Sequence, residues 1–178
     1  MTEGVSPNGR AIHRHLALFV GVLAFVLDQI SKAAAIFLLS TPPGTVPVTS
    51  FFNLSLGFNR GVSFGMLSDL GNRGPVMLSL LAIAVIIFLI VWYCKTSQPK
   101  ERVGIAMIIG GACGNLFDRV RNGAVTDFLD FYVGPYHWPA FNFADVWITL
   151  GAALVVAAAV FAPKFDEQSH SDRLTRGE

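Results

Sequence analysis

The chain has 178 residues and a formal net charge of +1; 53% of its residues are hydrophobic and only 14% are charged. A soluble domain carries roughly a quarter charged residues, so this composition excludes an ordinary soluble protein and indicates that lipid surrounds much of the chain. The near-neutral charge gives no electrostatic indication of a nucleic-acid partner, and we expect none.

Residues 1–15 are predicted to form a polar tail. The apolar run that follows could belong to a signal peptide, but no small-residue cleavage site comes after it. Asp28 and Lys32 come instead, and apolar residues then resume as far as Leu39. We therefore predict a retained transmembrane helix over 16–39, interrupted by polar groups near its outer end.

Three further apolar runs predict spans over 76–94, 103–117 and 143–161, each near the roughly 20 residues that a bilayer requires, although the third is short. Residues 40–75 are rich in proline, glycine, β-branched and aromatic residues, which predicts short strands joined by turns.

The third span carries Ala106, Gly110 and Gly114 at intervals of four, a spacing that lets another helix approach closely in lipid. Residues 118–142 are predicted to form a loop whose aromatic residues suit a membrane interface. Residues 162–178 are predicted to form a second polar tail. The two cysteines, Cys94 and Cys113, fall in apolar segments without metal-ligand spacing, so we interpret them as small buried hydrophobic residues.

Four spans place both termini on the same side of the membrane. Basic residues flank that side at Arg10, Arg14, Lys95, Lys100, Arg102 and Lys164. The opposite side carries Arg60, Arg73, Arg119 and Arg121. This modest excess favours cytoplasmic termini, with residues 40–75 and 118–142 facing outward.

Asp28 and Lys32 are four residues apart, so they share a helix face and can form an ion pair. Asp28 lies roughly 18 Å along the span from Leu16, where an unpaired charge is costly. The pair could orient the outer loop, or it could contact a substrate.

Asn115, Asp118 and Arg119 share one face at the outward end of the third span. Lipid would reject this face, so it should turn toward protein or a wet cavity. A helix end capped by polar groups is the alternative, although the depth of Asn115 favours a site lined by protein.

Asp127 follows the outward exit of the third span, and Asp145 lies at the inward entry of the fourth, one turn after Asn142. If these carboxylates are close together, they would share a proton, as in an aspartic protease. Separate loop and capping roles remain the alternative, because spacing alone does not show that the two aspartates meet.

Five motifs resemble signal peptidase II, the lipoprotein signal peptidase of bacteria and an aspartic peptidase of family A8. They stand in the family's order over nearly the whole chain: DQISK at 28–32, FNRGVSFG at 58–65, GGACGNLFDRV at 110–120, VTDF at 125–128 and FNFAD at 141–145. The resemblance implies an all-α membrane protein with four transmembrane helices, a small extracytoplasmic β-cradle over 40–75 and a partly helical periplasmic lid after Asp127.

The implied activity is an aspartic endopeptidase of the bacterial inner membrane, with its active site near the periplasmic face. Its substrates would be prolipoproteins that carry diacylglyceryl on the lipobox cysteine, cut just before that cysteine. Membrane lipid would surround it, globomycin would inhibit it, and no metal or organic cofactor is implied.

By motif, the catalytic pair would be Asp127 and Asp145. The positions that would line the substrate and inhibitor pocket are Asn59, Asn115, Arg119 and Asn142. The polar positions that would support the site are Asp28, Lys32 and Asp118. Asp130 is interpreted as solvated or locally hydrogen-bonded, and two departures from the family pattern, Arg60 and Trp147, bear on the shape of the pocket.

Two other classes of membrane protein fit the sequence less well. A presenilin-like protease is disfavoured because the chain lacks the GxGD motif. A small transporter or proton pathway that uses its intramembrane carboxylates is the alternative from a different class. It is disfavoured because the chain has no internal repeat and its acids gather toward one face of the membrane.

Overall fold

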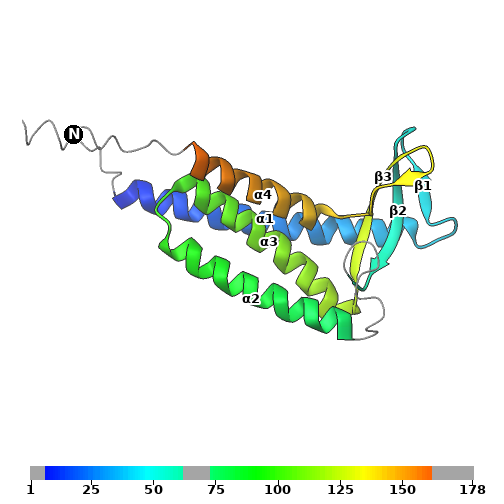
Figure 1. The fold of residues 1–178 in the computed structure, drawn as a ribbon, viewed down its shortest axis with the longest axis horizontal. Coiled ribbons are helices and arrows are strands. Elements are labelled where there is room, and N and C mark those ends of the chain that lie inside the picture. Colours follow the sequence, from blue (N-terminus) through cyan, green and yellow to red (C-terminus); the bar gives the residue numbers. More distant parts are fainter. Residues whose placement is uncertain (1–6, 62–72, 162–178) are drawn as a thin grey trace, which may run out of the picture.

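Four long helices form an elongated bundle in the computed structural model, which describes residues 7–61 and 73–161. They are α1 (Pro7–Leu39), α2 (Arg73–Lys95), α3 (Pro99–Asn122) and α4 (Phe143–Val160). All four are long and apolar enough to cross a membrane, which confirms the predicted four-span architecture. Figure 1 shows them side by side, with a small sheet at the end of the bundle far from the N-terminus.

Helices α1 and α3 are much longer than predicted, whereas α2 and α4 lie within three residues of the predicted bounds. Helix α1 begins at Pro7, inside the predicted tail, and proline suits a first helical turn because its missing N–H needs no partner there. Helix α3 continues to Asn122, so Asp118 and Arg119 are helical. Gly123 ends it in the left-handed conformation that glycine adopts readily, with φ of 70°. Residues 1–6 and 162–178 of the predicted tails, and 62–72 of the expected cradle, lie outside the described residues.

Helix α3 contacts the other three helices, and its small residues explain how it does so. A Cβ added to Gly110 would lie 2.3 Å from the carbonyl oxygen of Gly21 on α1. A Cβ on Gly114 would lie 2.3 Å from Oδ2 of Asp28. The spacing of small residues therefore produces the close approach that it predicted, and α1 is the helix that approaches.

A second row of glycines brings α4 equally close to α3. A Cβ on Gly104 would lie 2.7 Å from the carbonyl oxygen of Gly151, and one on Gly111 would lie 2.5 Å from that of Ala144. Ala144 is in the first turn of α4, so this contact holds the start of α4 against α3.

Gly110→Ala should therefore destabilise the bundle. The new methyl group would clash with the α1 backbone, which cannot rotate away as a side chain could, so we expect a loss of about 1–3 kcal/mol in the free energy of unfolding. Thermal unfolding in detergent measures the effect. The control is Gly57→Ala, whose Cβ would lie 3.8 Å from its nearest neighbour. Equal midpoints for the two variants would contradict the packing described above.

The sheet has four antiparallel strands in the order β1 (Thr45–Pro47), β2 (Phe52–Asn59), β3 (Val125–Val133) and β4 (Tyr136–His137). Strands β1 and β2 lie in the segment where short strands were predicted. The prediction of a partly helical lid after Asp127 is wrong, because residues 125–133 form the strand that pairs with β2. Its backbone pairs with that of β2, and residues 125–128 are buried on both faces of the strand.

A small apolar core joins this sheet to the bundle. Phe128 of β3 packs with Ala35 and Leu39 at the end of α1, and all three side chains are buried. Burial of Phe128 fixes the faces of the neighbouring strand residues, because successive side chains alternate across a sheet. The residue before it, Asp127, is thereby directed away from this core.

Candidate active site

Asp127 lies on β3 with its carboxylate almost fully buried, at 5% exposure. Its Oδ1 accepts a hydrogen bond from Nδ2 of Asn142 at 2.7 Å, and its Oδ2 accepts one from Nδ2 of Asn59 at 3.2 Å. Asn59 faces Val125 across the ladder, two residues from Asp127 and hence on the same face of the sheet. The β2–β3 register thus brings one predicted pocket residue to one predicted catalytic residue.

Asp145 lies in the first turn of α4 and takes part in a capping box. The backbone N–H of Asn142 donates to Oδ2 of Asp145 at 3.2 Å, and the N–H of Asp145 donates to Oδ1 of Asn142 at 3.2 Å. Asp145 therefore has the capping role that was left open as an alternative. That role also determines where its carboxylate lies, because the box fixes the side chain against the start of the helix.

Two asparagine amides connect the two aspartates. Asn142 uses one N–H of its Nδ2 on Asp127 and the other on Oδ1 of Asn115, at 3.2 Å. Asn115 in turn donates from Nδ2 to Oδ1 of Asp145 at 2.8 Å. Asp127 and Asp145 thus belong to one hydrogen-bonded network, and every carboxylate oxygen of the pair accepts an N–H.

Lys32, on α1, makes three contacts that orient the network. Its Nζ lies 2.9 Å from Oδ2 of Asp28, 3.2 Å from Oδ2 of Asp118 and 2.9 Å from Oδ1 of Asn115. The ammonium has three N–H groups, so all three are used. Because Oδ1 of Asn115 accepts from Lys32, the amide must turn its Nδ2 toward Asp145.

The two carboxylates paired with Lys32 each hold one part of the site. Asp28 accepts the backbone N–H of Ala144, in the first turn of α4, at 2.8 Å. Asp118 accepts the backbone N–H of Thr126, the residue before Asp127, at 2.9 Å. One ion cluster therefore places the helix that carries Asp145 and the strand that carries Asp127.

The pKa of Asp127 is raised from its usual 3.8 to about 6. Burial is the largest cause, since it disfavours the ionised form, and the negative charge of Asp145 adds to it. Hydrogen bonds from Asn142 and Asn59 oppose the shift. Asp127 therefore holds a proton more strongly than an ordinary aspartate does.

The environment of Asp145 differs from that of Asp127 in burial and in backbone position. It is only partly buried, and it sits at the N-terminus of α4, where the helix dipole favours negative charge. The two carboxyl groups thus differ in burial and in the backbone element that carries them.

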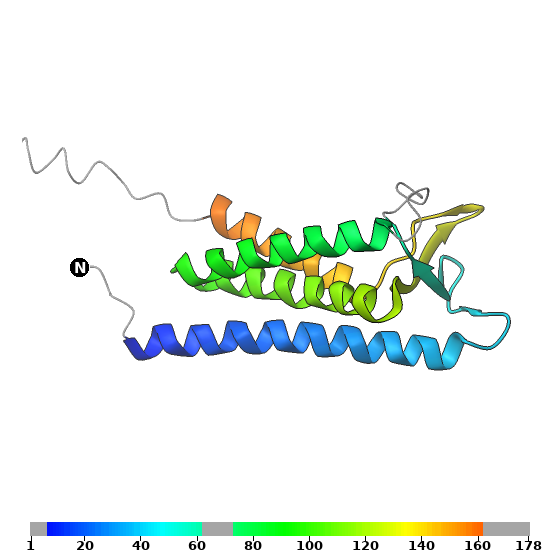
Figure 2. The same cartoon turned by 90° about the horizontal axis from the view of Figure 1, so that it is seen from below.

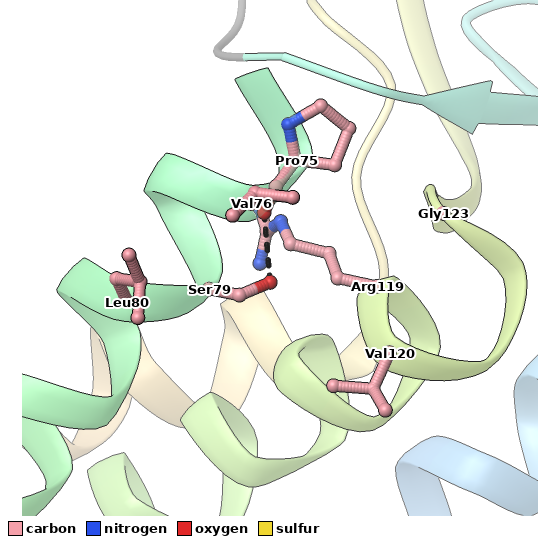
Figure 3. Close-up of a pocket in the computed structure, with 7 residues that line it drawn as sticks. All are labelled: Pro75, Val76, Ser79, Leu80, Arg119, Val120 and Gly123. Atoms are coloured by element: carbon pink, nitrogen blue, oxygen red, sulfur yellow. Dashed lines mark hydrogen bonds between the residues drawn. The ribbon is translucent and has the colours of Figure 1, made fainter. Parts of the chain in front are cut away.

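Arg119 extends from α3 toward the first turns of α2, as Figure 3 shows. It lines a cavity of about 480 Å³ together with Pro75, Val76, Ser79, Leu80, Val120 and Gly123. Its Nη1 donates weakly to the carbonyl oxygen of Asn115 at 3.4 Å, and its buried Nε has no hydrogen-bond partner within the described residues. Arg119 thus offers donors next to the aspartate network.

Asp130, on the same strand as Asp127, lies outside this network. Its Oδ2 accepts from Nδ2 of Asn53 at 3.2 Å, and its Oδ1 lies 2.8 Å from Nδ1 of His137. It is therefore locally hydrogen-bonded, one of the two environments predicted for it. Of the two departures from the family pattern, Arg60 is exposed and Trp147 is partly buried.

Sequence reasoning missed Gln29, which joins the Lys32 cluster. Its Nε2 donates to Oδ2 of Asp28 at 3.0 Å and to Oδ1 of Asp118 at 3.3 Å. Its position beside Asp28 in an apolar span is the signal that could have found it. Within residues 7–61 and 73–161, no three His, Cys, Asp or Glu side chains are grouped to hold a metal ion.

Known proteins resemble this chain in sequence. A family model described as Signal peptidase (SPase) II matches residues 20–161. A lipoprotein signal peptidase of Aeromonas hydrophila is 48% identical over 141 residues, which are 78% of this chain and 84% of the relative. Another, from Cellvibrio japonicus, is 40% identical over 153 residues, 84% of this chain and 86% of the relative.

The fold has solved counterparts as well. One structure of a bacterial membrane enzyme superposes with a TM-score of 0.72 at 28% identity, covering 86% of this chain and 93% of the other. A second gives a TM-score of 0.69 at 29% identity, covering 83% and 94%. With the family match extending over all four helices, this chain belongs to the signal peptidase II family of membrane peptidases.

Proposed function

We propose that this protein is an aspartic endopeptidase that removes the signal peptide from prolipoproteins, with Asp127 and Asp145 as its catalytic pair. The observation that carries the proposal is the single network in which Asn115 and Asn142 join the two carboxylates. Membership in the signal peptidase II family supports the substrate class. It does not favour the transporter alternative.

Asp145 acts as the base in this mechanism and Asp127 as the acid. The Asp145 carboxylate takes a proton from water while the water oxygen attacks the scissile carbonyl carbon, and Asp127 donates its proton to the carbonyl oxygen. In the second step, protonated Asp145 gives its proton to the leaving amide nitrogen as the C–N bond breaks. Asp127 recovers a proton from a hydroxyl of the intermediate, so both residues return to their starting states.

The surrounding polar residues would bind the substrate backbone. Arg119 offers guanidinium donors at the cavity between α2 and α3, and Asn59 lies at the end of β2 beside Asp127. The site lies where the sheet meets the bundle, which suits a substrate whose diacylglyceryl chains stay in lipid (Figure 1). We propose that both termini are cytoplasmic and that the sheet faces the periplasm of a bacterial inner membrane.

The substrate class can be tested with one pair of reactions. The purified protein is given the same prolipoprotein with and without diacylglyceryl on the lipobox cysteine, and cleavage is followed by gel shift. We expect cleavage of the modified form only, and we expect globomycin to abolish it. Cleavage of both forms at equal rates would contradict the proposed requirement for lipid. No cleavage of either, together with proton-coupled flux in liposomes, would favour a transporter.

The pH dependence of cleavage should follow the protonation of Asp127. The acid must carry its proton, so kcat/KM should fall as pH rises through the pKa of about 6. Asn59→Ala removes a hydrogen bond that favours the ionised form, so it should raise that pKa and move the decline to higher pH. A pH profile of initial rates measures both effects.

The matched control is Asn53→Ala, which removes the equivalent hydrogen bond to Asp130 on the same pair of strands. This variant should keep the wild-type profile. A shift to lower pH in Asn59→Ala, or equal shifts in both variants, would contradict the assignment of the acid to Asp127.

A further inference from the structure

A second hollow lies at the end of the bundle that carries the N-terminus, away from the aspartate network. Residues of α1, α2 and α3 line it, and Figure 2 shows these three helices running lengthwise, with α3 between α1 and α2 in that view. We call it the α1–α2 groove. It has a volume of about 560 Å³, and its main lining residues are Leu18, Val22, Ile90, Cys94, Ala106 and Gly110.

The length of the groove matches the thickness of one leaflet of a bilayer. It runs along α1 from Arg14 to Phe25, a rise of roughly 17 Å at 1.5 Å per residue. Half of a hydrocarbon core of about 30 Å is close to this length. Its walls are almost entirely apolar, whereas its end at Arg14 is charged. A lipid molecule has this same division, with one charged end and an apolar chain.

Charge at the open end indicates which lipid would bind. Arg14 is exposed, and its backbone carbonyl accepts a hydrogen bond from the Tyr93 hydroxyl at 3.0 Å, which ties α1 to α2 there. The guanidinium of Arg102 lies 5.7 Å from the centre of the Tyr93 ring. Lys95 is close by in sequence at the same end of α2, so the end is basic. A phosphate with net negative charge would be attracted to it.

The same charges argue against the other candidate occupant, a signal-peptide helix. Signal peptides begin with a positively charged region before their apolar segment. If such a helix lay in the groove, that region would meet Arg14 and Arg102 and be repelled. We propose that the α1–α2 groove binds one phospholipid with an anionic headgroup, whose phosphate contacts Arg14 and whose acyl chain lies against Ala106 and Gly110.

Native mass spectrometry of the detergent-purified chain tests this site. The protein is mixed with equal amounts of dioleoyl-phosphatidylglycerol and dioleoyl-phosphatidylcholine, and the lipid that stays bound is identified by mass. We expect one phosphatidylglycerol to be retained in preference to phosphatidylcholine. Arg14→Gln should reduce that preference about fivefold, because it removes one charge–phosphate contact. Arg121→Gln makes the same substitution at an exposed arginine at the opposite end of the bundle and should leave the preference unchanged.

A second variant tests the groove itself. Val22→Trp places a bulky ring in the groove and should release the bound lipid, whereas Val91→Trp, on an exposed part of α2 outside the groove, should not. Equal retention of the two lipids by the wild-type protein, or an unchanged preference in Arg14→Gln, would overturn the proposal. Displacement of the lipid by a synthetic signal-peptide helix that fails to bind Val22→Trp would assign the groove to the substrate and also overturn it.

Discussion

Asp127→Asn and Asp145→Asn should each lower kcat/KM for prolipoprotein cleavage by roughly 10²–10⁴-fold, the usual contribution of a positioned acid or base. An asparagine amide at Asp127 has no acidic proton to give to the scissile carbonyl. At Asp145 it cannot accept a proton from water. Because the two groups act in one step, the double variant should lose little more activity than either single variant. Initial rates with diacylglyceryl-modified prolipoprotein measure these effects.

Asp130→Asn is the matched control, because it makes the same change on the same strand at a buried carboxylate. Its partners are Asn53 and His137, and neither belongs to the Asn115–Asn142 network. We expect activity within a few-fold of wild type. Full activity in either member of the pair, or a loss in Asp130→Asn as large as theirs, would contradict the proposed mechanism.

Lys32→Met should destabilise the protein by about 3–5 kcal/mol, the cost of removing one partner from a buried ion pair. The side chain of Lys32 is only 3% exposed, and it neutralises both Asp28 and Asp118. Without it, these carboxylates would face each other unpaired between α1 and α3. Unfolding in detergent, followed by tryptophan fluorescence, measures the loss.

The same variant should also lose activity, since Lys32 orients the Asn115 amide toward Asp145. Lys95→Met is the control, because it removes the same charge from a lysine that is exposed at the far end of α2. If Lys32→Met unfolded with the wild-type midpoint, Lys32 would not be holding α4 and β3 in place.

Much of the bundle could be predicted because its determinants are local. Apolar runs of the length of a bilayer define the helices, and the small-residue spacing of Ala106, Gly110 and Gly114 indicates a face for close packing. The i, i+4 spacing of Asp28 and Lys32 indicates their pairing, which the structure shows at 2.9 Å. What the spacing could not indicate was the partner helix, because every span offers an apolar surface.

The shared network of Asp127 and Asp145 could not be predicted from spacing, because it depends on two contacts between distant parts of the chain. The register of β3 against β2 decides which face Asp127 occupies. The hydrogen bond from Ala144 to Asp28 decides where α4 begins relative to α1. Residues 125–133 were predicted to lie in a loop. Their pairing partner, β2, lies far earlier in the chain, so no local turn signal marks them as a strand.

The most direct test of the two-aspartate mechanism is a single-turnover reaction in ¹⁸O-labelled water. Enzyme in excess is mixed with diacylglyceryl-modified prolipoprotein, and the released signal peptide is analysed by mass spectrometry. If the water activated by Asp145 attacks the carbonyl directly, every released peptide should end just before the lipidated cysteine and carry ¹⁸O in its new carboxylate. Release of unlabelled peptide in the first turnover would show that an enzyme group, and not water, attacks the bond, and would contradict the proposed mechanism.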